Sequence, residues 1–428
     1  MSNSHHHHTH KFPKGFLWGT ATSSHQVEGN NHLNDWWRSE EEGKLRHKSG
    51  RGIGHFHKYK EDFDLAKKMN TNAHRLSIEW SRIEPKCGEW SEDAIEHYRK
   101  VLASLKKRNI RVMLTLHHFT LPQWFADKGG FEKRKNIKYF SRYVKFITEE
   151  VGEYVDIWIT INEPGVYIYQ SYMRGGEDDQ WPPFKKSTIT SLRVYWNLVI
   201  AHRKTYHIIH SVCDDNKCSS QVGISQNVLS FATYRKHGLI DNLVVWLAVN
   251  FANHGFYYLS GKKKTHDFLG LNYYFRVSLK RTRGSLHVIQ DDISGQGRET
   301  SDIGWEIYPR GLFDVLMDFR DYKLPIYITE NGIATSNDDR RQRFIVAHLN
   351  EVYHAIKGGT DIRGYFHWSL LDNFEWHLGY APKFGLIGVN RSTLKRTLKF
   401  SGKLYGEIAK ENGLIHKMMR YLGHETKL

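Results

Sequence analysis

The chain has 428 residues, of which 39% are hydrophobic, so it is long enough to bury a large globular core. No run approaches the roughly 18 apolar residues of a membrane span, and no signal-peptide core follows the first residues, so we expect a cytoplasmic protein without a membrane partner. The net charge of +16 raises the question of nucleic-acid binding, but the basic residues are scattered and no nucleic-acid-binding motif is present, so we expect no nucleic-acid partner.

The first residues and the cysteines bear on domain organisation and compartment. Residues 1–10 read MSNSHHHHTH, a pattern typical of a purification tag, and we predict a single folded domain over residues 11–428.

The three cysteines, Cys87, Cys213 and Cys218, are too few for a disulfide framework and suit a reducing cytosol. Cys213 and Cys218 lack the spacing of a zinc site, so we expect both to be unliganded. The sequence predicts no metal site and no cofactor, and it leaves the oligomeric state open.

Strand-like and helix-like segments alternate along the chain. The runs with the length and composition of buried strands are residues 16–21, 73–78, 111–116, 155–161, 221–225, 267–271, 325–329 and 362–368. Between them, apolar residues recur every three or four positions, for example over 95–105 and 345–356, as on one face of a helix. Apolar strands alternating with helices are typical of a parallel sheet that is covered on both faces. Because no linker rich in Pro, Gly or Ser divides the chain, we predict one (β/α)8 TIM barrel with long loop insertions.

Two of the predicted strands pass directly into a glutamate. The fourth leads into Asn162 and Glu163, and the seventh leads into Glu330 and Asn331. Residues that follow the strands of a TIM barrel line its active-site mouth, although a single acidic residue there also suits the start of the next helix. Two such glutamates on non-adjacent strands favour catalysis, because cleavage of a glycosidic bond requires paired carboxylates.

Seven motifs in the chain resemble those of the family 1 glycoside hydrolases, the β-glucosidase and β-galactosidase family. They are FPKGFLWGTATSSHQVEG from Phe12, NAHRLSIEWSRIEP from Asn72, HHFTLPQW from His117, TINEP from Thr160, DFLGLNYY from Asp267, ITENG from Ile328 and HWSLLDNFEW from His367. The resemblance covers almost the whole chain. It implies a barrel enzyme that hydrolyses β-glycosides with retention of configuration and acts on small-molecule substrates.

The resemblance implies a catalytic role for each matching residue. Glu163 is expected to be the general acid/base and Glu330 the nucleophile, with their carboxyl groups about 5–5.5 Å apart, as retention requires. Arg75, at the end of the second strand, is expected to keep Glu330 ionised, and Tyr274 to hydrogen-bond it. Asn162 is expected to contact the sugar 2-hydroxyl, a contact that strengthens in the transition state.

The same resemblance predicts the residues that hold the sugar. They are Gln26, His118, Glu375 and Trp376, which hydrogen-bond hydroxyl groups, Trp368, on which the sugar ring stacks, and Phe119, Trp305 and Phe384 in the pocket wall. A pyranose has a polar rim and apolar faces. Hydrogen-bonding side chains beside aromatic rings therefore suit it.

Two positions narrow the expected substrate. Glu375 stands where 6-phospho-β-glycosidases carry a smaller residue, and a carboxylate there would repel phosphate. Glu163 is present where the plant myrosinases carry Gln, so the proton donor for ordinary O-glycosides is retained. We therefore expect hydrolysis of terminal, non-phosphorylated β-D-glucosyl residues, and of β-D-galactosyl or fucosyl residues.

The sequence also departs from the family pattern. Phe119 replaces a Trp whose ring N–H holds the sugar 3-hydroxyl in many members, which puts the sugar preference in doubt. Residues 227–272 are short for the family, and they favour either a mobile wall or a side pocket lined by Trp246, Phe251, Tyr257 and Tyr258, although such aromatics are more often core residues. The stretch GGEDDQWPPF, residues 175–184, differs from the usual loop and is expected near the aglycone entrance.

Two other functions stay open on the sequence alone. A sugar-binding homologue without activity is disfavoured by the intact Glu163 and Glu330 pair, and hydrolysis of an aryl β-glucoside would separate it from an enzyme. A basic nucleic-acid-binding or scaffold protein on the same barrel is the other, since a fold alone does not fix function. Salt-dependent binding would reveal it.

Overall fold

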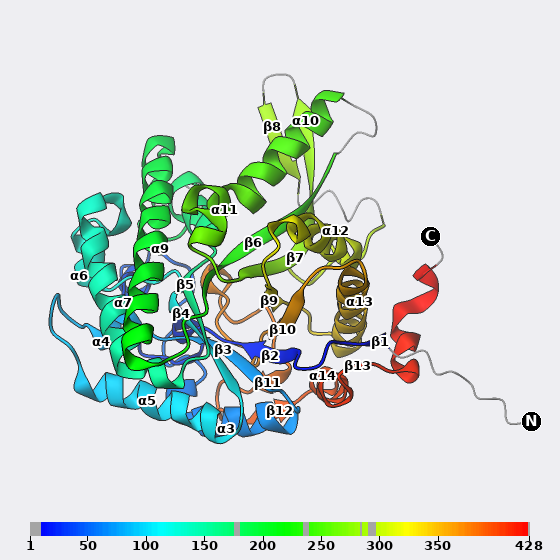
Figure 1. Cartoon of the computed structure of the whole chain (residues 1–428), viewed down its shortest axis with the longest axis horizontal. Coiled ribbons are helices and arrows are strands. Elements are labelled where there is room, and N and C mark those ends of the chain that lie inside the picture. Colours follow the sequence, from blue (N-terminus) through cyan, green and yellow to red (C-terminus); the bar gives the residue numbers. More distant parts are fainter. Residues whose placement is uncertain (1–9, 175–179, 234–238, 283–284, 290–296, 427–428) are drawn as a thin grey trace, which may run out of the picture.

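The computed structural model describes residues 10–174, 180–233, 239–282, 285–289 and 297–426. Eight parallel strands close into a barrel, which confirms the predicted fold, and the last strand pairs with the first (Figure 1). Around the barrel these strands are β2 (Leu17–Ala21), β3 (Ala73–Ser77), β4 (Arg111–His117), β5 (Ile157–Asn162), β6 (Val222–Thr233), β7 (Leu269–Thr282), β9 (Ile326–Asn331) and β10 (Ile362–Trp368). Each overlaps one of the apolar runs in the sequence.

Helices surround the barrel and supply the outer layer of the core (Figure 1). The longer ones are α3 (His55–Lys68), α5 (Glu92–Lys107), α7 (Ile137–Val151), α9 (Thr188–Asn216), α10 (Leu239–Ala248), α12 (Pro309–Phe319), α13 (Asp338–Lys357) and α14 (Phe400–Glu411). The shorter ones are α1 (Ser24–Val27), α2 (Asp35–Glu41), α4 (Trp80–Ile83), α6 (Gln123–Asp127), α8 (Pro164–Ile168) and α11 (Gly255–Ser260). Two π-helical segments, Tyr169–Met173 and Val249–His254, continue α8 and α10.

Shorter elements complete the chain. The 3-10 segments are Gly130–Glu132, Arg134–Asn136, Gly152–Tyr154, Lys262–Lys264, Arg320–Tyr322, Trp376–Leu378 and His416–Thr426. The remaining strands are β1 (His10–Lys11), β8 (Ser285–Ile289), β11 (Ile387–Val389), β12 (Arg396–Leu398) and β13 (Gly413–Leu414).

Local sequence explains why α5 forms where it does. The Ser91 side chain caps its first turn by accepting a hydrogen bond from the Ala94 N–H. Acidic residues occupy the first turn and basic residues the last, as the helix dipole favours. The predicted apolar face is buried against the barrel. The helix is therefore specified by its ends and by its periodicity together.

Within the barrel, side chains from several strands fill the interior. They are Leu17, Ala73, Met113, Ile157, Ile159, Phe268, Tyr327 and Phe366. A TIM barrel closes around such a packed core rather than around a pore. The carboxyl ends of the strands are thereby held in one ring, which positions the side chains that follow them.

At the amino terminus, the described chain begins with a short strand. His10 pairs with Leu414, and Lys11 with Gly413, so that β1 and β13 form a two-stranded sheet. The remaining residues of the expected tag, 1–9, lie outside the described residues. None of the helices in the described residues is both long and apolar enough to cross a membrane.

Cys213 and Cys218 form a disulfide, which the sequence analysis did not predict when it took the three cysteines to suit a reducing cytosol. The reason is local. Lys217 ends α9 in the left-handed region, with φ of 54°, and this turns the chain back on itself. The Cα atoms of the two cysteines consequently lie 4.6 Å apart. Cys87 is a free, exposed cysteine.

Two of the strands extend beyond the barrel. The pairing of β6 and β7 continues to Thr233 and Leu279, and β8 adds to β7 in antiparallel orientation. Helix α10 packs on this extension through Val244, Val245 and Ala248. It stands beside β8 at the top of Figure 1.

The four aromatics that we considered as a side pocket do not share one environment. Trp246, Phe251 and Tyr258 are exposed, whereas Tyr257 is buried and donates a hydrogen bond to the Gly270 carbonyl.

Candidate active site

Glu163 lies where β5 ends, as predicted, and its backbone is unusual. Its φ of 43° places a non-glycine residue in the left-handed region, and its N–H donates to the Ser225 carbonyl at 2.6 Å. Such conformations concentrate at functional sites, where the surrounding structure holds them. The side chain is buried, and its carboxylate accepts a hydrogen bond of 2.6 Å from the Asn272 amide. Burial raises the pKa of Glu163 to about 8, and the charge of Glu330 acts in the same direction.

Glu330 lies inside β9 and has a different environment. Arg75 forms an ion pair with one carboxylate oxygen, and the Tyr274 hydroxyl donates to the other at 2.5 Å. Burial raises the pKa of Tyr274 well above its usual value, and the charges of Glu330 and Glu163 add to this, so the phenol keeps the proton that it donates. Both contacts match the sequence prediction. Arg75 occupies the middle of β3 rather than its end.

A chain of hydrogen bonds connects the two glutamates. The Asn162 side-chain oxygen Oδ1 accepts a hydrogen bond from Arg75 at 2.6 Å and one from the Asn272 amide at 3.3 Å. Arg75 contacts Glu330, and Asn272 contacts Glu163. The two carboxylates therefore belong to one polar network at the same end of the barrel.

Asn272 is a functional residue that the sequence analysis did not assign. It stands in the motif DFLGLNYY, two residues before Tyr274. Its position in β7 gives the available signal, because alternate residues of a strand point to the same side. Asn272 and Tyr274 thus reach Glu163 and Glu330 from one strand.

A second polar group faces this network. Glu375 accepts hydrogen bonds from the Trp368 indole at 3.2 Å and from Gln26 at 3.4 Å. Burial raises the pKa of Glu375 to about 8. His118 lies 3.3 Å from the Asn162 amide, and burial lowers its pKa well below the usual value, so the ring is neutral. These groups have the donors and acceptors that a sugar rim needs.

Aromatic rings line the same space. The His118 ring is roughly parallel to Trp368 and to Trp376, with ring centres 6.1 and 6.0 Å away. Trp305 packs against Phe275 and Tyr274, with ring centres 4.7 and 5.4 Å apart. Phe384 lies 6.1 Å from the Tyr274 ring. The structure thus brings together all the residues that the sequence predicts for this site.

Phe119 has its own aromatic surroundings. It is buried, with φ of 73°, and its ring centre lies 4.8 Å from Trp181 and 5.2 Å from Trp376. The Trp181 indole donates to His377 at 3.0 Å. Trp181 comes from the divergent stretch 175–184, of which residues 175–179 lie outside the described part. The divergent loop and the substitution at Phe119 therefore meet in space.

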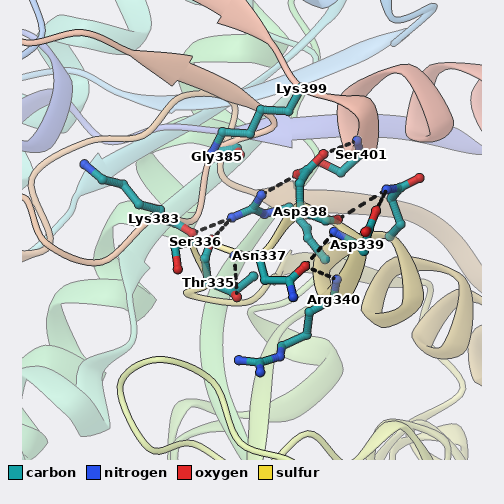
Figure 2. Close-up of polar contacts among 12 residues, drawn as sticks. Thr335, Ser336, Asn337, Asp338, Asp339, Arg340, Lys383, Gly385, Lys399 and Ser401 are labelled. Atoms are coloured by element: carbon teal, nitrogen blue, oxygen red, sulfur yellow. Dashed lines mark hydrogen bonds and ion pairs between the residues drawn. The ribbon is translucent and has the colours of Figure 1, made fainter.

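Arg341 binds two loops that border the site, and the sequence analysis missed it. It is fully buried in α13 and donates to the carbonyls of Thr335 and Lys383 and to the Asp338 carboxylate. Figure 2 shows Asp338 also joined to Ser401 of α14, beside Thr335 and Lys383. Thr335 follows the Glu330 strand, and Lys383 precedes Phe384. Arg341 thus ties together two loops that border the pocket.

In the parts of the chain that the structure describes, no group of three or more His, Cys, Asp and Glu side chains is arranged to hold a metal ion.

Comparison with known proteins places this geometry in a family. The sequence model of glycosyl hydrolase family 1 matches residues 8–239 and 248–414. A β-glucosidase A of Acetivibrio thermocellus is 32% identical, over 94% of this chain and 99% of that protein. A β-galactosidase of Pyrococcus woesei is 28% identical, over 95% of this chain and 98% of that protein.

Solved structures agree with these sequence matches. A β-glycosidase from Pyrococcus horikoshii has a TM-score of 0.90 and 37% identity, and the match covers 97% of this chain and 99% of that one. A family 1 β-glucosidase from Thermotoga maritima in complex with isofagomine lactam has a TM-score of 0.87 and 28% identity, with 95% and 100% of the two chains covered.

Proposed function

Because the chain belongs to glycosyl hydrolase family 1, it is a glycoside hydrolase that cleaves β-glycosides with retention of configuration, and we propose that Glu163 is its general acid/base and Glu330 its nucleophile. One observation carries the assignment. The two buried glutamates have opposite surroundings: Glu163 has its pKa raised to about 8, whereas Glu330 contacts a guanidinium and a phenol donor.

In the first step, the Glu330 carboxylate attacks the anomeric carbon while Glu163 gives its proton to the leaving oxygen. The glycosidic bond breaks, and a bond forms between the sugar and Glu330. In the second step, Glu163 takes a proton from water, which attacks the same carbon and releases Glu330. The sugar leaves with its original configuration because the carbon has been inverted twice.

The network between the glutamates supports this cycle. Arg75 stabilises the negative charge that returns to Glu330 each time its carboxylate is regenerated. Asn272 holds the Glu163 carboxyl in place through both of its protonation states. The Asn162 amide is directed at the sugar 2-hydroxyl, where a hydrogen bond that strengthens in the transition state accelerates the reaction.

The experiment that tests the two roles uses Glu330→Ala and Glu163→Ala. The first change should abolish turnover of every β-glycoside. The second should spare the first step for substrates with activated leaving groups, which need little protonation. Azide should then accelerate the second mutant, because it replaces water without needing a base. Equal losses on activated and unactivated substrates in both mutants would contradict the assignment.

We propose a terminal, non-phosphorylated β-D-glucosyl residue as the substrate, with β-D-galactosyl and fucosyl residues also accepted. The relatives that support this proposal are named β-glucosidase and β-galactosidase. A series of aryl β-glycosides that differ only in the sugar tests this directly. We also propose that hydrolysis needs no cofactor, so that a chelator leaves turnover unchanged.

A further inference from the structure

Helix α10 presents an apolar face to solvent. Its outward residues are Leu239, Ile240, Leu243, Trp246 and Leu247, which are all more than half exposed. Its inward side, which carries Val244, Val245 and Ala248, covers the β6–β7 extension. The outward face is thus at least as apolar as the inward one. An exposed apolar patch of this kind is typical of an interaction surface.

Neighbouring segments continue this face. Phe251 is 63% exposed and stacks on Tyr195 of α9, with ring centres 6.1 Å apart. Next to Tyr195 in the chain, Trp196 is exposed, and it shares one side of α9 with Leu192 and Ile189, which are also exposed. We call these exposed apolar side chains the apolar face; they are Ile189, Leu192 and Trp196 of α9, Leu239, Ile240, Leu243, Trp246 and Leu247 of α10, and Phe251.

The charge beside the apolar face is positive. Arg193, Arg203 and Lys204 are exposed on the same side of α9 as Trp196. No acidic residue occurs in α9 before Asp214, and Asp241 of α10 falls on the inward side by its spacing from Val244 and Val245. Apolar residues with Trp among them, bordered by Lys and Arg, are typical of helices that lie on anionic membranes.

Part of the apolar face lies in a segment that the family model does not match. The family model matches residues 8–239 and 248–414, so it leaves out residues 240–247, which form most of α10 and carry both its outward and its inward side chains. The catalytic machinery of the family therefore does not account for this helix.

We propose that the apolar face docks on an anionic lipid bilayer. The helix side chains enter the interfacial region, and the basic residues of α9 contact the headgroups. Because α10 packs on the strand extension at the carboxyl end of the barrel, docking places the mouth beside the bilayer.

The test is flotation of the full chain with vesicles of phosphatidylcholine, with or without phosphatidylglycerol. Wild-type protein should float with the anionic vesicles, and less so at high salt, since the headgroup attraction is screened. The variant Leu243→Glu/Trp246→Glu should bind roughly tenfold or more weakly, because it loses two large apolar contacts. Phe400→Glu is the matched control. Phe400 is 70% exposed on α14, outside the apolar face, and the change should leave binding unaltered.

Turnover of a soluble aryl β-glucoside reports on folding independently of vesicle binding, and it should be equal in all three proteins. The proposal is overturned if wild type stays with the vesicle-free fraction. It is also overturned if the double variant floats as well as wild type. Light scattering gives the remaining outcome: a dimer that the double variant converts to monomer, with no vesicle binding, would assign the face to self-association instead.

Discussion

At the scale of single residues, the site depends on which buried carboxyl group is hydrogen-bonded to the network of the nucleophile. Glu163 and Glu375 both have their pKa raised to about 8 by burial, yet only Glu163 is bonded to the network that reaches the nucleophile. The proton that Glu163 carries at neutral pH is the one that the leaving group needs.

The pH dependence of catalysis follows from this. The protonated form of Glu163 is the active one, so kcat/KM for an alkyl β-glucoside should fall by roughly tenfold per pH unit as the pH rises through the pKa of about 8. In Glu163→Gln, the residual turnover of the same alkyl glucoside should show no alkaline limb. Glu375→Gln is the control: it weakens sugar binding but should keep the limb. If the alkaline limb is lost in Glu375→Gln and kept in Glu163→Gln, the proton donor is Glu375 instead.

Phe119 gives a prediction about the sugar. An indole at this position would supply a donor for the 3-hydroxyl, and one hydrogen bond contributes about 0.5–1.5 kcal/mol, or a roughly two- to twelve-fold gain in kcat/KM. The structure also gives the opposing effect. Phe119 is packed against Trp181 and Trp376, so Phe119→Trp should destabilise the fold by about 1–3 kcal/mol in urea unfolding.

Comparison with a 3-deoxyglucoside separates these effects, because crowding affects both substrates alike. The ratio of kcat/KM for the glucoside to that for the 3-deoxy analogue should rise in Phe119→Trp. An unchanged ratio would mean that another group already serves the 3-hydroxyl in wild type.

At the scale of elements, the loops around the pocket depend on α13. Arg341→Met removes one donor from the Thr335 and Lys383 carbonyls and from the Asp338 carboxylate, and breaking a buried ion pair costs about 3–5 kcal/mol. Lys383 and Asp338 keep their other donors, the Thr335 N–H and Ser401. Arg343→Met on the same helix is the matched control. Its exposed contact with Glu299 contributes about 0–1 kcal/mol. Urea unfolding of the two variants measures the difference, and similar midpoints would show that the contacts of Arg341 do not stabilise the loops.

The disulfide gives a second prediction at this scale. It joins the end of α9 to the segment that leads into β6, and closing so short a loop stabilises by about 2 kcal/mol in the chain-entropy model. Reductant should therefore lower the urea midpoint of wild type and leave that of Cys213→Ser/Cys218→Ser unchanged. If reductant lowers both equally, the pair is not formed in solution. The expectation of a reducing compartment rested on unpaired cysteines, and it loses that support.

The sequence predicts some elements well and others poorly, for physical reasons. The barrel strands are buried on both faces, so their apolar runs are unmistakable, and Glu163 and Glu330 stand directly after or within such runs. Arg341 acts on backbone carbonyls, which have no sequence signature. Helix α10 is apolar on both sides, so its composition predicts burial, whereas one of its sides is exposed. The cysteine pairing depends on the left-handed turn at Lys217.

At the scale of the whole molecule, one closed sheet places groups from distant parts of the chain in a common site. Arg75, Asn162, Asn272 and Glu330 come from four different strands, yet each contacts another member of the set. The motifs that resemble the family lie at the strand ends, and the closed barrel arranges these ends in one ring. The pocket wall, by contrast, comes from loops, and there the chain differs most from the family pattern.

The pairing of β1 with β13 has a consequence for how the polypeptide can be connected. His10 lies opposite Leu414, so the beginning and the end of the ordered barrel are neighbours in space although they are 404 positions apart by their numbers. The polypeptide can therefore be reconnected: a linker that runs from the end of the 3-10 segment His416–Thr426, whose Met418 is buried in the core, back to β1, with a new opening at the turn after α5, preserves every strand neighbour in the barrel. Such a circular permutant should retain wild-type turnover of an aryl β-glucoside, because the turn at Asn109 precedes β4, at the end of the barrel opposite the mouth. A permutant that folds but is inactive would show that the order of synthesis, and not only the closed ring, is needed to assemble the site.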